Sequence, residues 1–159
     1  MPMEERKFIQ IGIVVRDLEK ALVQYGKYLY KGPWDIYTFA PPEMTDLTYM
    51  GKPSEWSALL GLAWIGDRHI ELIQPLKGPN TYYDHLEKKG EGLHHIKEWV
   101  KDCQSAIAEW AKKGVRVVQS GRLGDDEFYY LDTVPLLGFY LELGNNGHLR
   151  APDRQYTAK

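Results

Sequence analysis

The sequence has little that would tie it to a large or charged partner. Its single cysteine, Cys103, excludes a disulfide within the chain. Its 20 basic and 22 acidic residues leave a formal charge of −2, so no overall field favours nucleic acid or an anionic membrane. The first apolar run, after the charged start MPMEERK, is only about eight residues long, too short for a signal peptide or a membrane span. No glycine-rich phosphate loop is present. We therefore expect a cytoplasmic protein with a small-molecule partner.

The composition indicates an ordinary folded domain. The chain has 159 residues, of which 43% are hydrophobic and 26% are charged. Such a chain can bury a proper core, and it differs from disordered and fibrous sequences. The length allows one compact domain or two tightly joined half-domains.

The chain contains an internal repeat. The stretch QIGIVVRD at residues 10–17 aligns without gaps with HIKEWVKD at residues 95–102, at an offset of 85. Each stretch reads as a strand that ends at an aspartate, Asp17 or Asp102. An aspartate at this place caps the free amides of a following helix. Both halves therefore open with a strand and an amphipathic helix.

Turn signals after each helix lead into further strands, which predicts a βαβββ module in each half. The fold class is therefore α+β. We expect helices at 18–30 and 103–113, and strands at 34–39, 57–66, 69–74, 115–119, 127–132 and 138–143, with a long loop at 40–55. The expected organisation is an N-terminal extension (1–7), a first module (8–77), a linker with a short helix (78–92), a second module (93–144) and a polar, mobile C-terminal tail (145–159).

Four polar side chains are predicted to share one face of the sheet. Side chains alternate across a strand, so Gln10 and His95 lie opposite the aliphatic face of their strands. The closing strands match at an offset of 71, and the same parity places Glu71 and Glu142 on that face. Two buried carboxylates cannot both stay ionised without a cation or protons to offset them. Something positive is therefore expected between them.

The paired βαβββ repeat with the motifs GEGLHHI, HIELIQPL and FYLEL resembles the vicinal oxygen chelate superfamily, over residues 8–144. The resemblance implies a pseudo-twofold cup of curved sheet with helices outside and a divalent metal at its base. The family's ligands map onto Gln10, Glu71, His95 and Glu142. One imidazole and three oxygen donors suit Mn²⁺, Mg²⁺, Co²⁺, Ni²⁺ or Zn²⁺.

The resemblance also implies a chemistry. Enzymes of this type remove a proton next to a carbonyl and stabilise the resulting enolate on the metal. We expect a reaction like that of methylmalonyl-CoA epimerase, with a lactoylglutathione lyase of the glyoxalase I type as the alternative. The substrate is then an acyl thioester or a 2-oxo compound. Glu142 is the favoured proton carrier, Glu71 the second, and Glu43 on the long loop a weaker candidate.

Two departures from the family pattern lie on the ligand face of the sheet. Gln10 stands where a histidine is usual, and Lys97 stands where a small residue is usual. The Lys97 ammonium could pair with Glu71 or Glu142 and replace the metal, which gives a third reading: a metal-free binding protein of the bleomycin-resistance type. A neutral Lys97 beside a metal could instead act as a base. Extradiol dioxygenase chemistry fits poorly, because it needs two histidines.

The remaining expectations concern aromatic and histidine residues. By parity, Trp99 and Tyr140 face the cup and are predicted to contact substrate. Many of the other aromatic residues are expected in the core or in the interface of a homodimer. No function is expected for His69, His85, His94 or His148.

Overall fold

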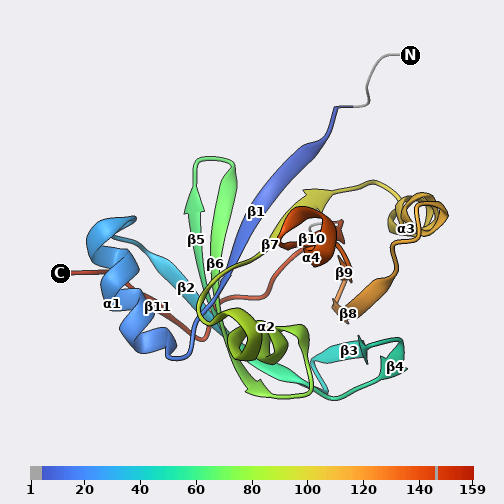
Figure 1. The fold of residues 1–159 in the computed structure, drawn as a ribbon. Coiled ribbons are helices and arrows are strands. Elements are labelled where there is room, and N and C mark those ends of the chain that lie inside the picture. Colours follow the sequence, from blue (N-terminus) through green and yellow to red (C-terminus); the bar gives the residue numbers. More distant parts are fainter. Residues whose placement is uncertain (1–4, 146) are drawn as a thin grey trace.

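A computed structural model describes residues 5–145 and 147–159 (Figure 1). Within these ranges the chain forms four helices and one mixed sheet of 11 strands. The order of the strands in the sheet is β11-β2-β5-β6-β1-β7-β10-β9-β8-β3-β4. This architecture confirms the α+β fold class. No helix in the described ranges is long and apolar enough to cross a membrane.

The first half of the chain builds one side of the sheet. β1 pairs in parallel with β6, which pairs antiparallel with β5, which pairs antiparallel with β2. The helix α1 begins where expected, because the Asp17 side chain accepts a hydrogen bond from the Lys20 N–H. The elements are β1 (Lys7–Val14), α1 (Leu18–Tyr28), β2 (Trp34–Phe39), β5 (Ser57–Ile65) and β6 (Arg68–Lys77).

The second half repeats this pattern. β7 pairs in parallel with β10, which pairs antiparallel with β9, which pairs antiparallel with β8. Asp102 caps α3 by accepting from the Ser105 N–H, as Asp17 does for α1. The elements are β7 (Gly92–Trp99), α3 (Cys103–Lys112), β8 (Val117–Leu123), β9 (Asp126–Leu131), α4 (Val134–Leu137) and β10 (Tyr140–Gly144).

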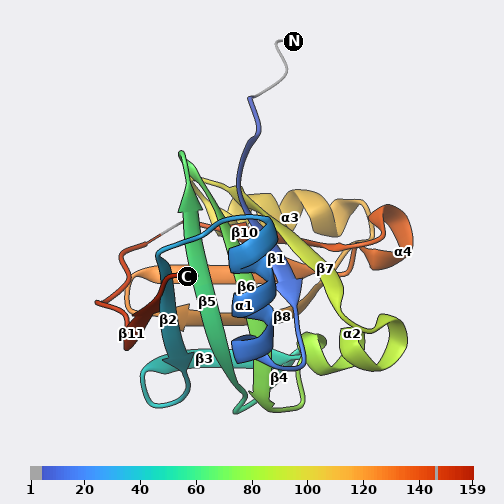
Figure 2. The ribbon, with the colours of Figure 1, turned by 90° about the vertical axis from the view of Figure 1, so that its left-hand side faces the viewer.

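The two halves meet at the antiparallel pair β1 and β7, which lies at the centre of the sheet. The segment between the halves carries α2 (Thr81–Lys89), capped by Asn80. Figure 1 shows α1 and α3 on opposite sides of the molecule, and in Figure 2 α1 lies along β5 and β6. Under α1 lies an apolar cluster that includes Leu18, Leu22 and Leu72, and Leu131, Leu141 and Leu143 form a matching cluster with Ala106 and Trp110 of α3. α1 and α3 therefore cover one face of the sheet, and the cavity lies on the other, where Tyr82 of α2 contributes to its wall.

Two expectations about irregular segments are wrong. The predicted loop at 40–55 contains β3 (Met44–Tyr49) and β4 (Lys52–Pro53), and β3 pairs with β8 of the other half because buried Met44 and Leu47 anchor it. The tail predicted to be mobile contains β11 (Arg154–Tyr156), which pairs with β2. Backbone pairing at a sheet edge needs no apolar pattern, so the polar sequence of the tail did not reveal it.

Candidate active site

A cavity of about 70 Å³ lies on the open face of the sheet, between the two halves. Most of its wall is apolar and aromatic, and its polar residues gather together. The apolar residues include Tyr37, Phe39, Met44, Trp56, Leu60, Leu62, Leu123 and Phe128, and the polar ones include Gln10, His69, Glu71, Lys97, Asp126 and Glu142. A small, mostly apolar molecule with a few polar atoms fits such a lining.

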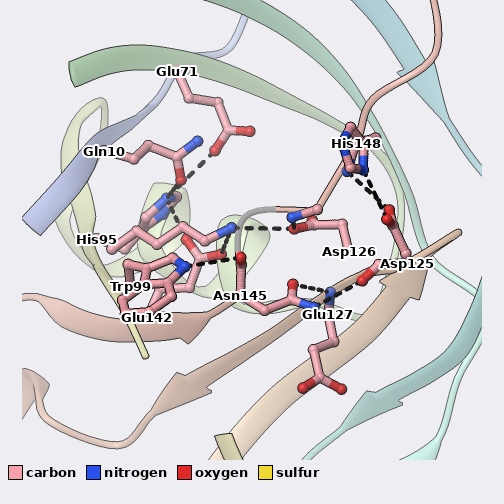
Figure 3. A network of polar contacts seen from close by, with 12 residues as sticks. Gln10, Glu71, His95, Trp99, Asp125, Asp126, Glu127, Glu142, Asn145 and His148 are labelled. Carbon is pink, nitrogen blue, oxygen red and sulfur yellow. Dashed lines mark hydrogen bonds and ion pairs between the residues drawn. The ribbon is translucent and has the colours of Figure 1, made fainter. Parts of the chain in front are cut away.

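His95 is the centre of the polar cluster (Figure 3). Its Nε2 atom lies 3.1 Å from Gln10 Oε1, 3.4 Å from Glu71 Oε2 and 3.0 Å from Glu142 Oε2. The four side chains come from four neighbouring strands, β1, β6, β7 and β10. The structure therefore brings together all four residues that the repeat and the parity of the strands placed on one face.

Two glycines make room for the cations of the cluster. Gly12 is paired with His95 across the β1–β7 ladder, and a Cβ atom on Gly12 would lie 1.9 Å from His95 Cε1. A Cβ atom on Gly144 would lie 2.4 Å from Lys97 Cε. A side chain at either glycine would therefore push a charged residue out of its place in the site.

Lys97 joins the cluster on the far side of Glu142. Its Nζ atom lies 3.3 Å from Glu142 Oε1 and 3.8 Å from Asp126 Oδ1, and 6% of its side chain is exposed. The two oxygens of Glu142 thus face different cations, His95 on one side and Lys97 on the other. Lys97 does not replace His95 at the centre, but it supplies a positive charge that the carboxylates need.

Burial and pairing set the charges in the cluster. Burial would lower the pKa of His95, but Glu142 and Glu71 outweigh it and raise the pKa to about 9. The pKa of Lys97 is also raised, since Glu142 and Asp126 overcome its burial. Burial acts to raise the pKa of Glu142, yet Lys97 and His95 bring that pKa below its usual value. The pKa of Glu71 is raised above its usual value, chiefly by burial. Glu142 is therefore held as an ion between two cations.

His94 fixes the far side of the His95 ring. The Nδ1 atoms of the two rings are 2.9 Å apart, and His94 Nε2 lies 3.1 Å from Thr81 Oγ1. Burial and the neighbouring His95 lower the pKa of His94, so a charged His95 donates to a neutral His94, which donates to Thr81. His94 was assigned no function from the sequence, and the structure gives it a positioning role.

The donor set fits a divalent cation in its chemistry. Adjacent ligands of an octahedral ion with bonds of about 2.1 Å lie about 3 Å apart, which is close to the spacing of the Gln10, Glu71 and Glu142 oxygens from His95 Nε2. Glu142 Oε2 is buried, and its ion pair with His95 Nε2 at 3.0 Å lacks the geometry of a hydrogen bond in the described chain. No group of three or more His, Cys, Asp or Glu side chains among residues 5–145 and 147–159 is already arranged as a metal site. A cation would thus require the His95 proton to leave and the oxygens to adjust.

Three other predicted site residues lie away from this cavity. The indole N–H of Trp99 donates to the Asn145 carbonyl, and the residue is 39% exposed. Tyr140 packs on the His94 ring and lines a different pocket. Glu43 pairs with Arg150, 2.6 Å away. The positions of these residues do not support contact with a molecule in the cavity. Strand parity holds only within a strand, and Trp99 and Tyr140 lie at strand ends.

His69 is a site residue that sequence reasoning missed. It lies on β6 two residues before Glu71, so strand parity already placed it on the same face. It lines the cavity, is 4% exposed, and packs edge-on against Trp64 with ring centroids 4.3 Å apart. Burial, with Lys97 nearby, lowers its pKa to about 4, so the ring is neutral at pH 7.

Comparison with known proteins places this geometry in a family. A family model described as the glyoxalase/bleomycin resistance protein/dioxygenase superfamily matches residues 9–130. A search of curated proteins finds no match to the chain. Several solved structures share its fold, at identities that speak for the fold alone.

Three of these structures are representative. A variant of methylmalonyl-CoA epimerase from Streptomyces coelicolor, in complex with 2-nitronate-propionyl-CoA, has a TM-score of 0.67 and 22% identity, over 94% of this chain and 100% of the other. The Mycobacterium tuberculosis methylmalonyl-CoA epimerase gives 0.61 and 20%, over 86% and 85%. A hypothetical protein from Bacillus halodurans C-125 gives 0.64 and 23%, over 92% and 99%.

Substitution of Gly12 by alanine should displace the His95 ring and destabilise the fold. The new methyl group would overlap the imidazole ring, and overpacking of this kind costs about 1–3 kcal/mol of unfolding free energy. Urea unfolding measures the loss. Gly61→Ala is the matched control, because its Cβ would meet leucine methyl groups no closer than 3.3 Å. Equal unfolding free energies for the two variants would contradict the close approach of Gly12 to the His95 ring.

The charge of His95 should make the metal-free protein less stable at alkaline pH. The folded pKa of about 9 lies above the ordinary 6.5, so this contribution is complete below about pH 6.5 and is lost as the pH rises through 9. The loss amounts to at most about 3 kcal/mol. Urea unfolding in a chelating buffer should show this slope in the wild type and in His148→Gln, but not in His95→Gln. A slope that persists in His95→Gln would assign it to another group.

Proposed function

The chain belongs to the glyoxalase/bleomycin resistance protein/dioxygenase superfamily, and on this premise we propose that it is an enzyme that removes a proton next to a carbonyl group. The reaction resembles that of methylmalonyl-CoA epimerase, and a lyase reaction of the glyoxalase I type is the alternative. The observation that carries the proposal is the convergence of Gln10, Glu71, His95 and Glu142 at one side of an apolar cavity. Similarity of fold to the epimerases supports it without deciding the substrate.

Gln10, Glu71, His95 and Glu142 would hold one divalent cation. When bound, such an ion acts as a Lewis acid toward the carbonyl oxygen of the substrate. His95 must then present a neutral Nε2, while its Nδ1–H remains fixed by His94. The oxygen-rich donor set favours Mn²⁺, Mg²⁺ or Co²⁺ over Zn²⁺.

Glu71 is the better placed proton carrier. Glu142 lies between His95 and Lys97, with 4% of its side chain exposed, and both cations oppose its protonation. Glu71 has one cation partner, His95 at 3.4 Å, and 12% of its side chain is exposed. A Glu71 oxygen would take the proton from the substrate carbon and return it there or to the neighbouring carbon. The preference for Glu142 that the sequence suggested is therefore reversed in this proposal.

Lys97 would act as a charge rather than as a base. Its ammonium is paired with Glu142 and Asp126 and is held over Gly144, so it stays protonated. A fixed positive charge in a buried site stabilises the negative charge that proton removal leaves on the substrate. The apolar wall would hold the acyl group of a thioester or of a 2-oxo compound.

The ion pairs of Glu142 with Lys97 and His95 also favour a second candidate function. Lys97 and His95 together already compensate Glu142, so the cavity can be stable without a metal. A metal-free protein that binds a small apolar molecule, as in the bleomycin-resistance type, is therefore the alternative from a different class. Metal titration separates the two.

The purified protein should bind about one divalent ion per chain, and Gln10→His should tighten that binding by roughly tenfold, because an imidazole is a stronger donor than an amide oxygen. Titration of chelator-treated protein with Mn²⁺ and Co²⁺ measures both. Gln24→His, on the exposed face of α1, is the matched control and should leave the affinity unchanged. Unchanged affinity in Gln10→His would remove Gln10 from the ligand set, and wild-type protein without metal at any loading would favour the binding protein.

Incubation in D₂O should exchange the hydrogen next to the substrate carbonyl, with methylmalonyl-CoA or the hemithioacetal of methylglyoxal and glutathione as probes. Glu71→Gln should lower the exchange rate at least about 100-fold, because general base catalysis contributes on that scale. Metal occupancy should persist, since the amide keeps an oxygen donor. Mass spectrometry reports the exchange.

Glu43→Gln is the matched control for this experiment, because Glu43 pairs with Arg150 at the surface. Its exchange rate should equal that of the wild type. A wild-type exchange rate in Glu71→Gln would transfer the role of base to Glu142 or Lys97, and a loss of exchange in Glu43→Gln would transfer it to Glu43, in the turn before β3. No exchange with either probe would leave the proposed reaction without support.

A further inference from the structure

His69 is buried in the cavity wall without a polar partner. The residue is 4% exposed, and neither Nδ1 nor Nε2 has a hydrogen bond within the described chain. It lines the cavity together with Gln10, Glu71 and Lys97. An uncharged imidazole offers one N–H donor and one nitrogen acceptor, and both are unmet here.

The other buried histidines show what a structural histidine does in this fold. Both ring nitrogens of His94 have partners, His95 and Thr81. His85 Nε2 lies 2.9 Å from the Leu93 carbonyl oxygen. Burial without any partner is unfavourable for a polar ring, so His69 is not explained by packing alone.

The surroundings hold the ring of His69 in place. Trp64 contacts it edge-on, and the ladder between β1 and β6 pairs His69 with Gln10. Gln10 Oε1 contacts His95 Nε2, and Gln10 makes no hydrogen bond to His69 in the described chain. A fixed, unpartnered hydrogen-bonding group that lines a cavity is what recognition of a ligand requires.

We propose that His69 is a substrate-binding residue that hydrogen-bonds an oxygen substituent of the acyl group, beyond the two oxygens that face the His95 cluster. The proposal rests on the proposed function, because it takes the His95 cluster as the place where those two oxygens bind. It adds a substrate class: acyl compounds with a third oxygen, a hydroxyl or a carbonyl, rather than a plain hydrocarbon chain. A site built to hydrogen-bond a substrate group discriminates strongly against the analogue that lacks it.

Lactate and glycerate are a matched pair of probes for this inference. Both carry a carboxylate with a neighbouring hydroxyl, and glycerate adds one hydroxyl on the next carbon. Titration calorimetry with Mn²⁺ present gives the ratio of their affinities without any need for turnover. Wild-type protein should prefer glycerate by about 5- to 30-fold, the effect of one hydrogen bond that replaces an unmet group.

His69→Phe keeps a flat ring and removes both nitrogens. It should bring the affinity ratio to about one while leaving lactate binding unchanged, and His69→Gln, which restores a donor and an acceptor, should recover part of the preference. His85→Phe is the matched control, because it removes a buried histidine that does not line this cavity, and it should keep the wild-type ratio. Urea unfolding of each variant separates a loss of binding from a loss of folding.

Three results would overturn the proposal: a wild-type ratio near one, binding of neither acid, or a ratio that survives in His69→Phe. A purely structural His69 would leave the ratio unchanged in His69→Phe, whatever the change in stability. Failure of the proposed reaction is seen elsewhere, in the absence of deuterium exchange. A protein that prefers glycerate through His69 but exchanges no deuterium would retain this inference and lose the reaction.

Discussion

The ionised carboxylate of Glu142, buried between two cations, is the constraint on which the site depends. A buried carboxylate without compensation would be neutral or would destabilise the fold. His95 and Lys97 each face one of its oxygens, at 3.0 and 3.3 Å. Removal of either cation would leave the Glu142 carboxylate with one cation partner instead of two. His95, Lys97 and Glu142 therefore act as a unit rather than as separate contributors.

The backbone accommodates this unit through the pseudo-twofold arrangement. The central ladder sets His95 across from Gly12 and Lys97 across from Gln10, so each cation faces a small or uncharged residue. Gly144, on the neighbouring strand, leaves the space that the Lys97 side chain fills. The repeat therefore brings the four donors of the site together. The two cations, His95 and Lys97, come from the second half alone.

The sequence predicted the convergence of four polar side chains better than it predicted the edges of the sheet. Strand parity and the repeat placed Gln10, Glu71, His95 and Glu142 together, because both depend on local alternation within well-defined strands. Strand parity also places His69 on this face. The sequence predicts no function for it, because no motif along the chain accompanies it. The pairing of β3 with β8 and of β11 with β2 joins segments far apart in sequence, and no local pattern reports such contacts.

Trp99 and Tyr140 show where parity stops. Both lie at the ends of their strands. Tyr140 is the first residue of β10, and the sequence had placed the start of that strand at residue 138. The indole N–H of Trp99 reaches the Asn145 carbonyl instead of the cavity. Trp99 is paired with Lys7 on one side and with Gly144 on the other, so pairing alone does not bring a side chain to the cavity, and strand parity is a guide to a shared face only away from the ends of a strand.

The charges of the site connect its two candidate functions. In the metal-free state His95 carries a proton, and with Lys97 it balances Glu142 and any charge on Glu71. Exchange of the His95 proton for a divalent cation would raise the charge of the site by one. Proton removal from a substrate carbon adds one negative charge at the same place, so the exchanged site would meet it with an opposite charge. The metal-free site lacks that surplus, which suits it to binding. Under the two proposals the same residues would serve either function, and the occupancy at His95 Nε2 would decide between them.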